Sequence, residues 1–182
     1  MPEAIARAAA ARGWTCLIVG GFVRDQVLGL PSKDIDLEFF GPTAGELRAF
    51  LEQFGEVKAV GASFGVFKLS HNGHDLDCSL PRRDSKNGSG HKGFVTTPDP
   101  NMTPGEAASR RDFTMNSMMM DPLTGEILDP FGGCRDLEND LLRHTSPAFA
   151  EDPLRVLRGM QFCSRFGLTA TWSTLKLCRS LA

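Results

Sequence analysis

The sequence CLIVGGFVRD, at residues 16–25, decides the fold of this chain because it joins two structural patterns. The apolar run before the glycines is typical of a buried strand, which we expect over residues 15–19. The following residues, 22–28, predict a helix that ends at Gly29. A buried strand that leads through two glycines into a helix indicates an α/β fold.

Gly20 and Gly21 also mark a possible phosphate site. A strand-to-helix turn leaves backbone N–H groups and the positive end of the helix for phosphate oxygens, and glycine allows a close approach. Arg24 lies one turn into the helix, where it can make a charge-assisted contact. The alternative is a tight turn with Arg24 and Asp25 on a solvated face, which glycines alone would favour. The spacing matches neither G-x-G-x-x-G nor G-x-x-x-x-G-K-[ST].

Two carboxylates, Asp34 and Asp36, follow in a segment over residues 34–40 that predicts a strand. Because strand residues alternate between faces, both carboxylates are expected on one face, with Ile35 and Leu37 toward the core. Like charges this close raise each other's pKa unless a cation lies between them, and Mg²⁺ prefers one or two carboxylates with substrate phosphates. A solvated strand face explains the pair alone, but the preceding glycine turn favours a metal site.

A third acid is expected, because two-metal phosphoryl transfer uses a carboxylate to bridge to, or to activate, the attacking hydroxyl. Asp75 and Asp77 lie on one face of a strand predicted over residues 74–80. We choose Asp77, which is nearer to the basic segment that follows. An exposed acid on an edge strand explains its spacing about equally well.

The rest of the chain alternates between helices and strands before it becomes helical. We expect helices over 3–12 and 43–54, and strands over 57–60, 66–70, 74–80 and 127–128, with Asn72-Gly73 as a hairpin turn. Helical patterns dominate from residue 106 onward. The prediction is an α/β domain over residues 1–148, followed by an all-helical segment over residues 149–182.

A long loop is expected over residues 81–104, which are rich in Gly, Pro, Asn, Asp and Lys and lack periodicity. From Arg82 to Arg111 there are six basic and three acidic residues, although the net charge of the chain is −2. A nucleic-acid contact and a solvated loop explain this charge about equally well.

The segment SRRDFTMN, residues 109–116, follows this basic stretch. Its two adjacent arginines can bind a triphosphate. On a helix Asp112 and Asn116 would share one face, from which they could brace the arginines or contact a ribose. The alternative is the start of a helix with surface charges.

The segment EDPLRVLR, residues 151–158, begins like a helix, with Asp152 as N-cap, proline as the first helical residue and Arg155 as an ion-pair partner. This account leaves unexplained why Arg155 and Arg158 recur along a stripe beside Phe162. A fixed Asp-Arg pair offers both acceptors and donors and can read the edge of a base.

The composition excludes several classes of protein. Its 41% hydrophobic and 23% charged residues are globular values, and 182 residues suit one domain, or one domain with the start of another. No apolar run approaches the ~20 residues of a membrane span, and residues 1–13 lack the apolar core of a secretory signal. The five cysteines include no C-x-x-C pair, which indicates reduced thiols and a cytoplasmic protein. The oligomeric state is not readable from the sequence.

Five motifs stand in order along the chain: GGFVRD, KDID, RRDFTMN, ILDPFGG and EDPLRVLR. Together they resemble the head and early neck of the class II tRNA nucleotidyltransferases (CCA-adding enzymes) and the related bacterial poly(A) polymerases. The resemblance implies a polymerase-beta-like nucleotidyltransferase head, with a mixed sheet flanked by helices, and then an all-helical neck. It also implies template-independent, two-metal transfer of CMP or AMP from CTP or ATP to an RNA 3′ end, above all that of tRNA, with release of pyrophosphate.

The same resemblance assigns roles to residues. Asp34, Asp36 and Asp77 would be catalytic, and Asp34 and Asp36 would hold Mg²⁺. The nucleotide-binding residues would be Gly20, Gly21, Arg24, Arg111, Asp112, Asn116, Asp152, Arg155 and Arg158. Within that set, Asp152 and Arg155 match a protein template for the incoming base. Residues 82–86 and 90–94 resemble a loop found in a subset of these enzymes.

Two features depart from the family pattern. Many members carry Arg where this chain has Gln161, which implies that one phosphate or base contact is lost or replaced. Members also continue into helical neck, body and tail regions that hold the tRNA, whereas this sequence ends at Ala182, as a truncated or a naturally short relative would. Two functions stay open: a nucleotidyltransferase of the CCA-, CC-, A-adding or poly(A) type, and a nucleotide- and metal-binding module without productive RNA turnover.

Overall fold

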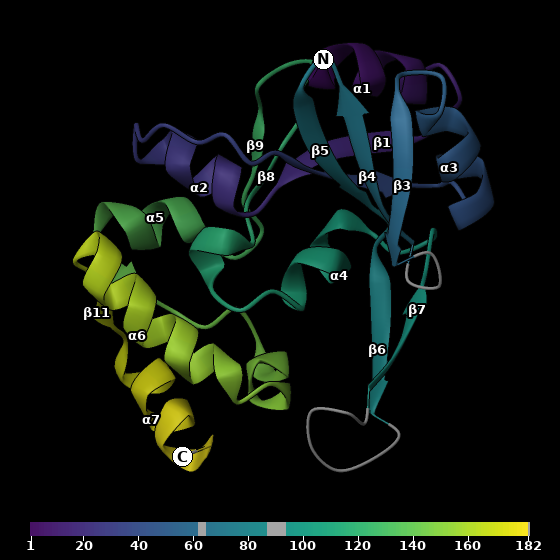
Figure 1. Ribbon diagram of the computed structural model, residues 1–182. Helices are drawn as coiled ribbons and strands as arrows, with labels where there is room; N and C mark the ends of the chain where they lie inside the picture. Colours follow the sequence, from purple (N-terminus) through teal and green to yellow (C-terminus); the bar gives the residue numbers. More distant parts are fainter. Residues whose placement is uncertain (62–64, 87–93, 182) are drawn as a thin grey trace.

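A seven-stranded mixed sheet forms the first part of the computed structural model, which describes residues 1–61, 65–86 and 94–181 (Figure 1). The strand order is β3-β4-β5-β2-β1-β8-β9. The strands are β1 Thr15–Val19, β2 Asp36–Phe40, β3 Glu56–Gly61, β4 Val66–His71, β5 His74–Ser79, β8 Met119–Met120 and β9 Ile127–Leu128. Only β2 and β5 run parallel, and the other neighbours in this sheet are antiparallel. The predicted mixed sheet is confirmed.

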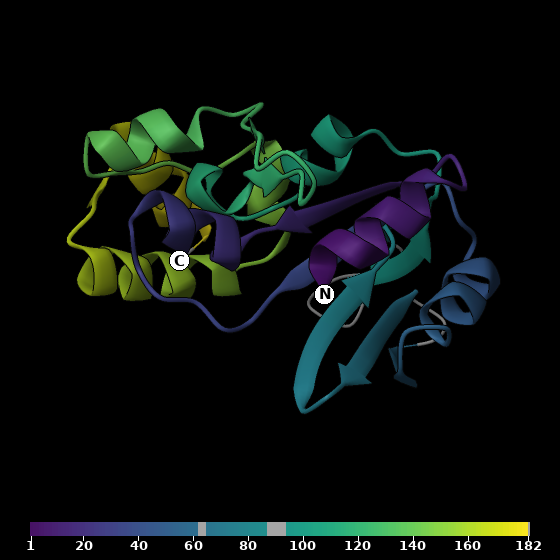
Figure 2. The same cartoon turned by 90° about the horizontal axis from the view of Figure 1, so that it is seen from above.

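Helices lie on both sides of the molecule, with α5, α6 and α7 on one side and α3 on the other (Figures 1 and 2). They are α1 Pro2–Ala10, α2 Gly21–Val27, α3 Ala44–Leu51, α4 Pro104–Ser109, α5 Gly133–Glu138, α6 Leu154–Phe166 and α7 Trp172–Leu181, with the 3-10 helices η2 Thr114–Asn116 and η3 Pro147–Glu151. Two short strands that the helical pattern did not predict, β10 Leu141–Leu142 and β11 Thr169–Ala170, pair in parallel among them. Within the described residues, no helix has the length and apolarity that crossing a bilayer requires.

One face of the sheet packs against α1 and α3 and forms the core. Leu37 and Leu69 of the sheet are fully buried in one cluster with Ile5 of α1 and Phe50 of α3. Because strand residues alternate between faces, the residues between these apolar ones point the other way. The opposite face carries polar side chains on β2, β4 and β5, beside a second buried apolar cluster in which Leu17 and Val19 of β1 pack with Ala108 of α4. The candidate site lies on this face.

The core continues from the sheet into the helical segment. The ring of Phe113 lies 5.3 Å from that of Phe149 and 5.7 Å from that of Phe162, in edge-to-face geometry. These three residues belong to the same buried cluster as the sheet residues. The predicted domain division at residue 148 stays a prediction, with apolar packing continuous across it.

Asp34 lies before strand β2 and is not part of it. We expected a strand over residues 34–40, whereas β2 begins at Asp36. Asp36 pairs with Val19, the last residue of β1, and the chain leaves the strand at Gly20 with a φ of 75°. No residue of β1 therefore pairs with Asp34. The prediction that Asp34 and Asp36 alternate along one strand is wrong.

Residues 81–104 contain more regular structure than the expected loop. Strands β6 Arg82–Lys86 and β7 Phe94–Pro98 form a separate antiparallel pair, and α4 begins at Pro104. The sequence of β6 lacks the apolar alternation of a half-buried strand, so the pattern did not indicate it. Residues 87–93, which hold most of the second half of the family-like loop, lie outside the described residues.

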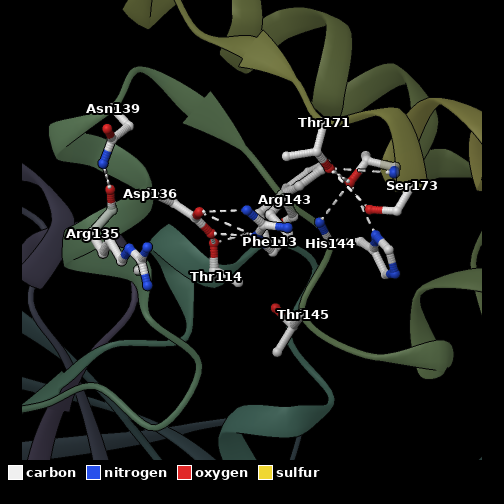
Figure 3. Close-up of polar contacts among 12 residues, drawn as sticks. Phe113, Thr114, Arg135, Asp136, Asn139, Arg143, His144, Thr145, Thr171 and Ser173 are labelled. Carbon is white, nitrogen blue, oxygen red and sulfur yellow. Dashed lines mark hydrogen bonds and ion pairs between the residues drawn. The ribbon is translucent and has the colours of Figure 1, made fainter.

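Polar contacts fix the chain around residues 112–116 against the helical segment (Figure 3). Thr114 donates through Oγ1 to Asp136 Oδ2 at 2.8 Å and through its backbone N–H to the carbonyl of Arg143 at 2.9 Å. Arg143 in turn donates from Nε and Nη2 to the buried Asp136 carboxylate at 3.0–3.1 Å. These bonds hold the segment that presents Asp112 and Asn116 to the site.

Candidate active site

Two carboxylates lie side by side on neighbouring parallel strands. Asp36, the first residue of β2, is in register with Asp77 of β5. The backbone N–H of Asp77 donates to the carbonyl of Ile35 at 3.2 Å. Residues in register point to the same face of a sheet, so both carboxylates project to the open face. The structure thus brings Asp77, rather than Asp75, beside Asp36.

Asp36 lies in a crowded electrostatic environment. Burial among neighbouring protein atoms raises its pKa, and the negative charge of Asp77 raises it further. Arg111 lowers the pKa, while Asp34 and Glu38 add smaller increases. Asp34 is therefore near Asp36 although it is not on the strand. Repulsion of this kind is relieved when a cation binds between the acids.

The acids suit a magnesium ion that substrate helps to hold. Among the residues that the structure describes, no three carboxylate, imidazole or thiol groups converge into a complete metal site. Asp36 and Asp77 supply hard oxygen donors, and Mg²⁺ commonly takes one or two carboxylates and completes its shell with water and phosphate oxygens. The donor set therefore fits a Mg²⁺ ion that arrives with a nucleotide.

The glycine turn is shaped by Arg111. Gly20 has a φ of 75°, and a Cβ placed on it would lie 2.9 Å from Arg111 Nη1. Its N–H already donates to the carbonyl of Met118 at 3.2 Å. We expected backbone N–H groups at this turn to be free for phosphate oxygens, and the N–H of Gly20 is not free. Glycine is needed at residue 20 because of its backbone conformation and the close arginine.

Arg24 is held by a buried network rather than pointing freely into solvent. Its Nε and Nη2 donate to Asp25 Oδ1 at 2.8 and 2.6 Å, and its Nη1 donates to Asn116 Oδ1 at 2.9 Å. The guanidinium also lies 4.7 Å from the centre of the Phe166 ring on α6. Arg24 therefore connects the glycine turn to α6 while it borders the site.

Asp112 continues the same network. Its Oδ1 accepts from Asn116 Nδ2 at 3.0 Å, and its Oδ2 faces Arg158 at 2.7 Å. We expected Asp112 and Asn116 on one helix, but Asp112 precedes the 3-10 helix η2. That local prediction is wrong because a 3-10 turn replaces the helix, although the two side chains do meet.

Helix α6 begins one residue later than expected. Pro153 is its N-cap, while Asp152 Oδ1 accepts from the N–H of Leu154 at 3.0 Å, so Asp152 still caps the first turn. Arg155 donates to the carbonyls of Ala148 and Arg110, each at 2.8 Å. These bonds fix the Arg155 guanidinium at the wall of the site.

A cavity of about 480 Å³ collects the predicted residues, and we call it the arginine cavity. Its lining includes Asp36, one of the three predicted catalytic acids, and every predicted nucleotide-binding residue: Gly20, Gly21, Arg24, Arg111, Asp112, Asn116, Asp152, Arg155 and Arg158. Asp34 and Asp77 are not part of this lining. The volume lies within the range of small-molecule sites.

Positive charge is concentrated in the arginine cavity. Desolvation, with Arg82 as the next contributor, lowers the pKa of Arg110 to about 10. Arg111 Nη2 lies 3.4 Å from Glu38 Oε2, and its buried Nε has no hydrogen-bond partner in the described part of the chain. A buried donor without a partner beside several arginines indicates an anionic ligand, because a phosphate oxygen would satisfy it.

A second cavity, of about 400 Å³, adjoins the first, and we call it the acid cavity. It is lined by Asp77, Lys68, Val60, Val19 and Cys78, and it shares Asp36, Arg111, Val66 and Ser79 with the arginine cavity. Asp36 therefore lies at the wall between two neighbouring spaces.

A comparison with protein families identifies this arrangement. The model of the poly(A) polymerase head domain matches residues 16–143, which is more than half of the chain. The chain belongs to the poly(A) polymerase head-domain family. Four of the five motifs that suggested this resemblance lie within the matched region, and the fifth, EDPLRVLR, follows it.

Curated relatives of this chain carry the name "Multifunctional CCA protein". The chain is 42% identical over 168 residues to a "Multifunctional CCA protein" of Stenotrophomonas maltophilia, a match that covers 91% of the chain and 40% of that relative. It is 46% identical over 167 residues to the protein of the same name from Haemophilus ducreyi, covering 90% of the chain and 39% of that relative. The chain thus spans about two fifths of the length of these relatives.

Solved structures share the fold of this chain. The Bacillus stearothermophilus CCA-adding enzyme, crystallised with CTP, matches with a TM-score of 0.79 at 29% identity, over 96% of this chain and 42% of that one. A tRNA nucleotidyltransferase in complex with a primer tRNA and an incoming ATP analogue matches with a TM-score of 0.79 at 28% identity, over 97% of this chain and 49% of that one. The predicted nucleotidyltransferase-head fold is confirmed.

Three further charged residues border the arginine cavity, although they are not in the nucleotide-binding set predicted from the sequence. Glu38 is buried and faces Arg111, and its position two residues after Asp36 was the available signal, since alternation places it on the same face. Arg110 and Arg82 also line the cavity. For Arg82 the charge of the basic stretch was the only indication, whereas Arg110 is one of the two adjacent arginines that the sequence offered for a triphosphate. Gln161 is exposed and lines neither cavity.

Proposed function

We propose that this chain is the catalytic head of an RNA nucleotidyltransferase that transfers CMP or AMP from CTP or ATP to the 3′ end of an RNA, with tRNA as the expected RNA. One observation carries the proposal: Asp36 stands beside Asp77 on the open face of the sheet and also borders a cavity lined by arginines. Carboxylates that can hold Mg²⁺ thus adjoin a space suited to a triphosphate. The CTP and ATP-analogue complexes of structurally similar proteins support this choice of ligand.

The arginine cavity would bind and orient the nucleotide. Arg111 has a buried Nε without a partner in the described residues, and its guanidinium would take a triphosphate oxygen there. Desolvation and cationic neighbours lower the pKa of Arg110. A nearby anion would act in the opposite direction and stabilise the charged form of its guanidinium. Asp152 and Arg155, at the wall of the cavity, offer an acceptor and donors for the edge of a base.

The reaction proposed is an in-line displacement at phosphorus. The RNA 3′-hydroxyl oxygen forms a bond to the α-phosphorus, the bond from that phosphorus to the bridging oxygen of the β-phosphate breaks, and pyrophosphate leaves with the electron pair. The Asp77 carboxylate accepts the hydroxyl proton and passes it to water. Mg²⁺, held by Asp36, Asp77 and Asp34, would neutralise charge on the triphosphate and lower the pKa of the hydroxyl.

The test is incorporation of labelled CMP or AMP into tRNA that lacks its CCA end, using the 182-residue chain with Mg²⁺. We expect incorporation by the wild type and a loss of about two to three orders of magnitude in Asp77→Asn, since losing a metal-binding carboxylate removes several kcal/mol of transition-state stabilisation. Asp75→Asn is the matched control. Asp75 is on the same strand and face but lines neither cavity, so its activity should stay within about twofold.

Nucleotide binding measured in parallel separates the alternatives. Binding of CTP with Mg²⁺, without any incorporation, would favour a nucleotide- and metal-binding module over a catalyst. Equal activity in Asp77→Asn and Asp75→Asn would remove Asp77 from the mechanism. A folded chain that neither binds nucleotide nor transfers it would show that the site assignment is wrong.

A further inference from the structure

Four charged residues form a straight row across the open face of the sheet. Lys58 of β3 is in register with Lys68 of β4, Lys68 with Asp77 of β5, and Asp77 with Asp36 of β2. Neighbouring strands lie about 4.8 Å apart, so Lys68 is one strand and Lys58 two strands away from the catalytic acid Asp77. Two positive charges thus lie in line with the acids, on the strands of the sheet that are farther from the glycine turn.

The two lysines are held loosely. Lys68 Nζ lies 3.6 Å from Asp77 Oδ1 and 3.8 Å from Asp75 Oδ2, and its side chain is 38% exposed. Lys58 Nζ lies 3.4 Å from Glu56 Oε1 with 66% of the side chain exposed. Ion pairs this long and this exposed contribute little, so either ammonium group can turn to a stronger anion.

The acid cavity lies beside this row. Lys68, Asp77 and Asp36 are among its lining residues, with Val60 and Val66 as apolar walls. Val60 is 67% exposed although it is apolar. A space with two carboxylates, one lysine, apolar walls and Arg111 at the wall shared with the arginine cavity suits a sugar next to a phosphate better than a triphosphate, whose several negative charges exceed what these two cations can balance beside the acids.

The chemistry of the proposed reaction, on which this inference rests, requires two ligands that meet at the acids. The attacking and leaving oxygens lie roughly in line across the α-phosphorus. With the triphosphate in the arginine cavity, the attacking hydroxyl must arrive from the other side of Asp36, where the acid cavity is. The proposed reaction thus places the 3′-terminal ribose of the RNA in the acid cavity. We propose that Lys68, with Lys58 behind it, binds the phosphates of the last RNA nucleotides.

Direct RNA binding without nucleotide tests this assignment. The probe is an acceptor-stem RNA hairpin that ends before CCA, labelled with fluorescein at its 5′ end, and the readout is anisotropy at several salt concentrations. We expect Lys68→Met to raise Kd about three- to fivefold, and the slope of log Kd against log salt to fall by about 0.7, as for the loss of one phosphate contact on a single strand. Lys58→Met should change both in the same direction and by less. The affinity for CTP with Mg²⁺ should stay unchanged in both variants.

Two further variants sharpen the result. Lys68→Arg keeps the charge and should restore RNA affinity, while Lys176→Met removes an exposed lysine on α7 and should leave it unchanged. The proposal is overturned if Lys68→Met binds RNA like the wild type, if the wild type binds no RNA, or if Lys68→Met loses CTP and RNA affinity equally. That last result would mean that Lys68 acts through Asp77. Intact lysine-dependent RNA binding without nucleotide transfer would support this inference and contradict the proposed function.

Discussion

The acid end and the arginine end of the site are built in different ways. Asp36 and Asp77 stand on paired strands, where backbone register fixes their positions. Arg24 and Arg158 stand on helices and are fixed by side-chain bonds to Asn116 and Asp112. The first arrangement depends on the sheet, whereas the second depends on a few buried polar side chains.

This difference predicts how each end responds to substitution. A sheet tolerates the loss of one outward carboxylate, because its hydrogen bonds are made by the backbone. A buried polar network does not, because removing one member leaves its partners without hydrogen bonds. We therefore expect changes at the acid end to alter chemistry with the fold intact, and changes within the network to alter stability as well.

The largest effect is expected for Asp36→Asn. Incorporation of CMP or AMP should fall by about three orders of magnitude, since a group that stabilises charge in the transition state is lost. CTP affinity without Mg²⁺ should not fall, because the arginines are untouched and one negative charge at the cavity wall is removed. The measurement is incorporation beside calorimetric binding. Near-normal incorporation would contradict the assignment of Asp36 to catalysis.

The next effect is expected for Arg111→Gln. The Kd for CTP with Mg²⁺ should rise about ten- to a hundredfold, the value of charge-assisted hydrogen bonds. Glu38→Gln should have the opposite sign and tighten CTP binding, because it removes a buried negative charge that faces Arg111. The double variant avoids leaving Glu38 buried without its partner. If both single variants weaken binding equally, the pair acts through folding and not through charge.

Asn116→Ala tests the buried network. The free energy of unfolding in urea should fall by about 1–3 kcal/mol, because Arg24 Nη1 and Asp112 Oδ1 each lose a buried partner. Asn139→Ala is the matched control, since Asn139 is exposed and its side-chain amide donates to the carbonyl of Arg135 at the surface. Its cost should stay within about 0.5 kcal/mol. Similar losses in both variants would show that the network contributes no special stability.

The smallest effect concerns pH and Asp36. Because the folded state raises the pKa of Asp36 above its ordinary 3.8, the folded chain holds this proton more tightly than the unfolded chain. Stability from this group therefore falls as pH rises from the ordinary pKa through the raised one. Without Mg²⁺, Asp36→Asn should be more stable than the wild type near pH 7, and the gain should shrink near pH 4. Urea unfolding at the two pH values measures it, and a gain that grows toward low pH would contradict the sign.

Strand alternation gave the correct environment for much of the acid end. It placed Leu37 in the core and Asp77 on the open face, and it would have placed Glu38 beside Asp36 had the pattern been followed two residues further. The pairing of Asp36 with Asp77 joins distant parts of the chain, so no local pattern contains it. Asp34 was misplaced because the end of β1 at Val19 decides where β2 begins.

The arginine end was recognised from motifs more than from local structure. Asp112 and Asn116 meet as expected, but through a 3-10 turn that the helical spacing did not distinguish from a helix. The role of Gly20 in making room for Arg111 depends on a contact between distant residues. Local sequence predicts which face a side chain takes, whereas packing between elements decides what it touches.

The wall that the two cavities share has a consequence for inhibitor design. A compound that fills the arginine cavity with an anion and the acid cavity with a sugar-like group would pass beside Asp36, which borders both. Joining two weak fragments by a short linker makes the second binding step intramolecular, with an effective concentration in the millimolar range. Each fragment alone would compete with one substrate only. The joined compound would compete with both, and a single substitution at Asp36 could not relieve inhibition without also removing activity.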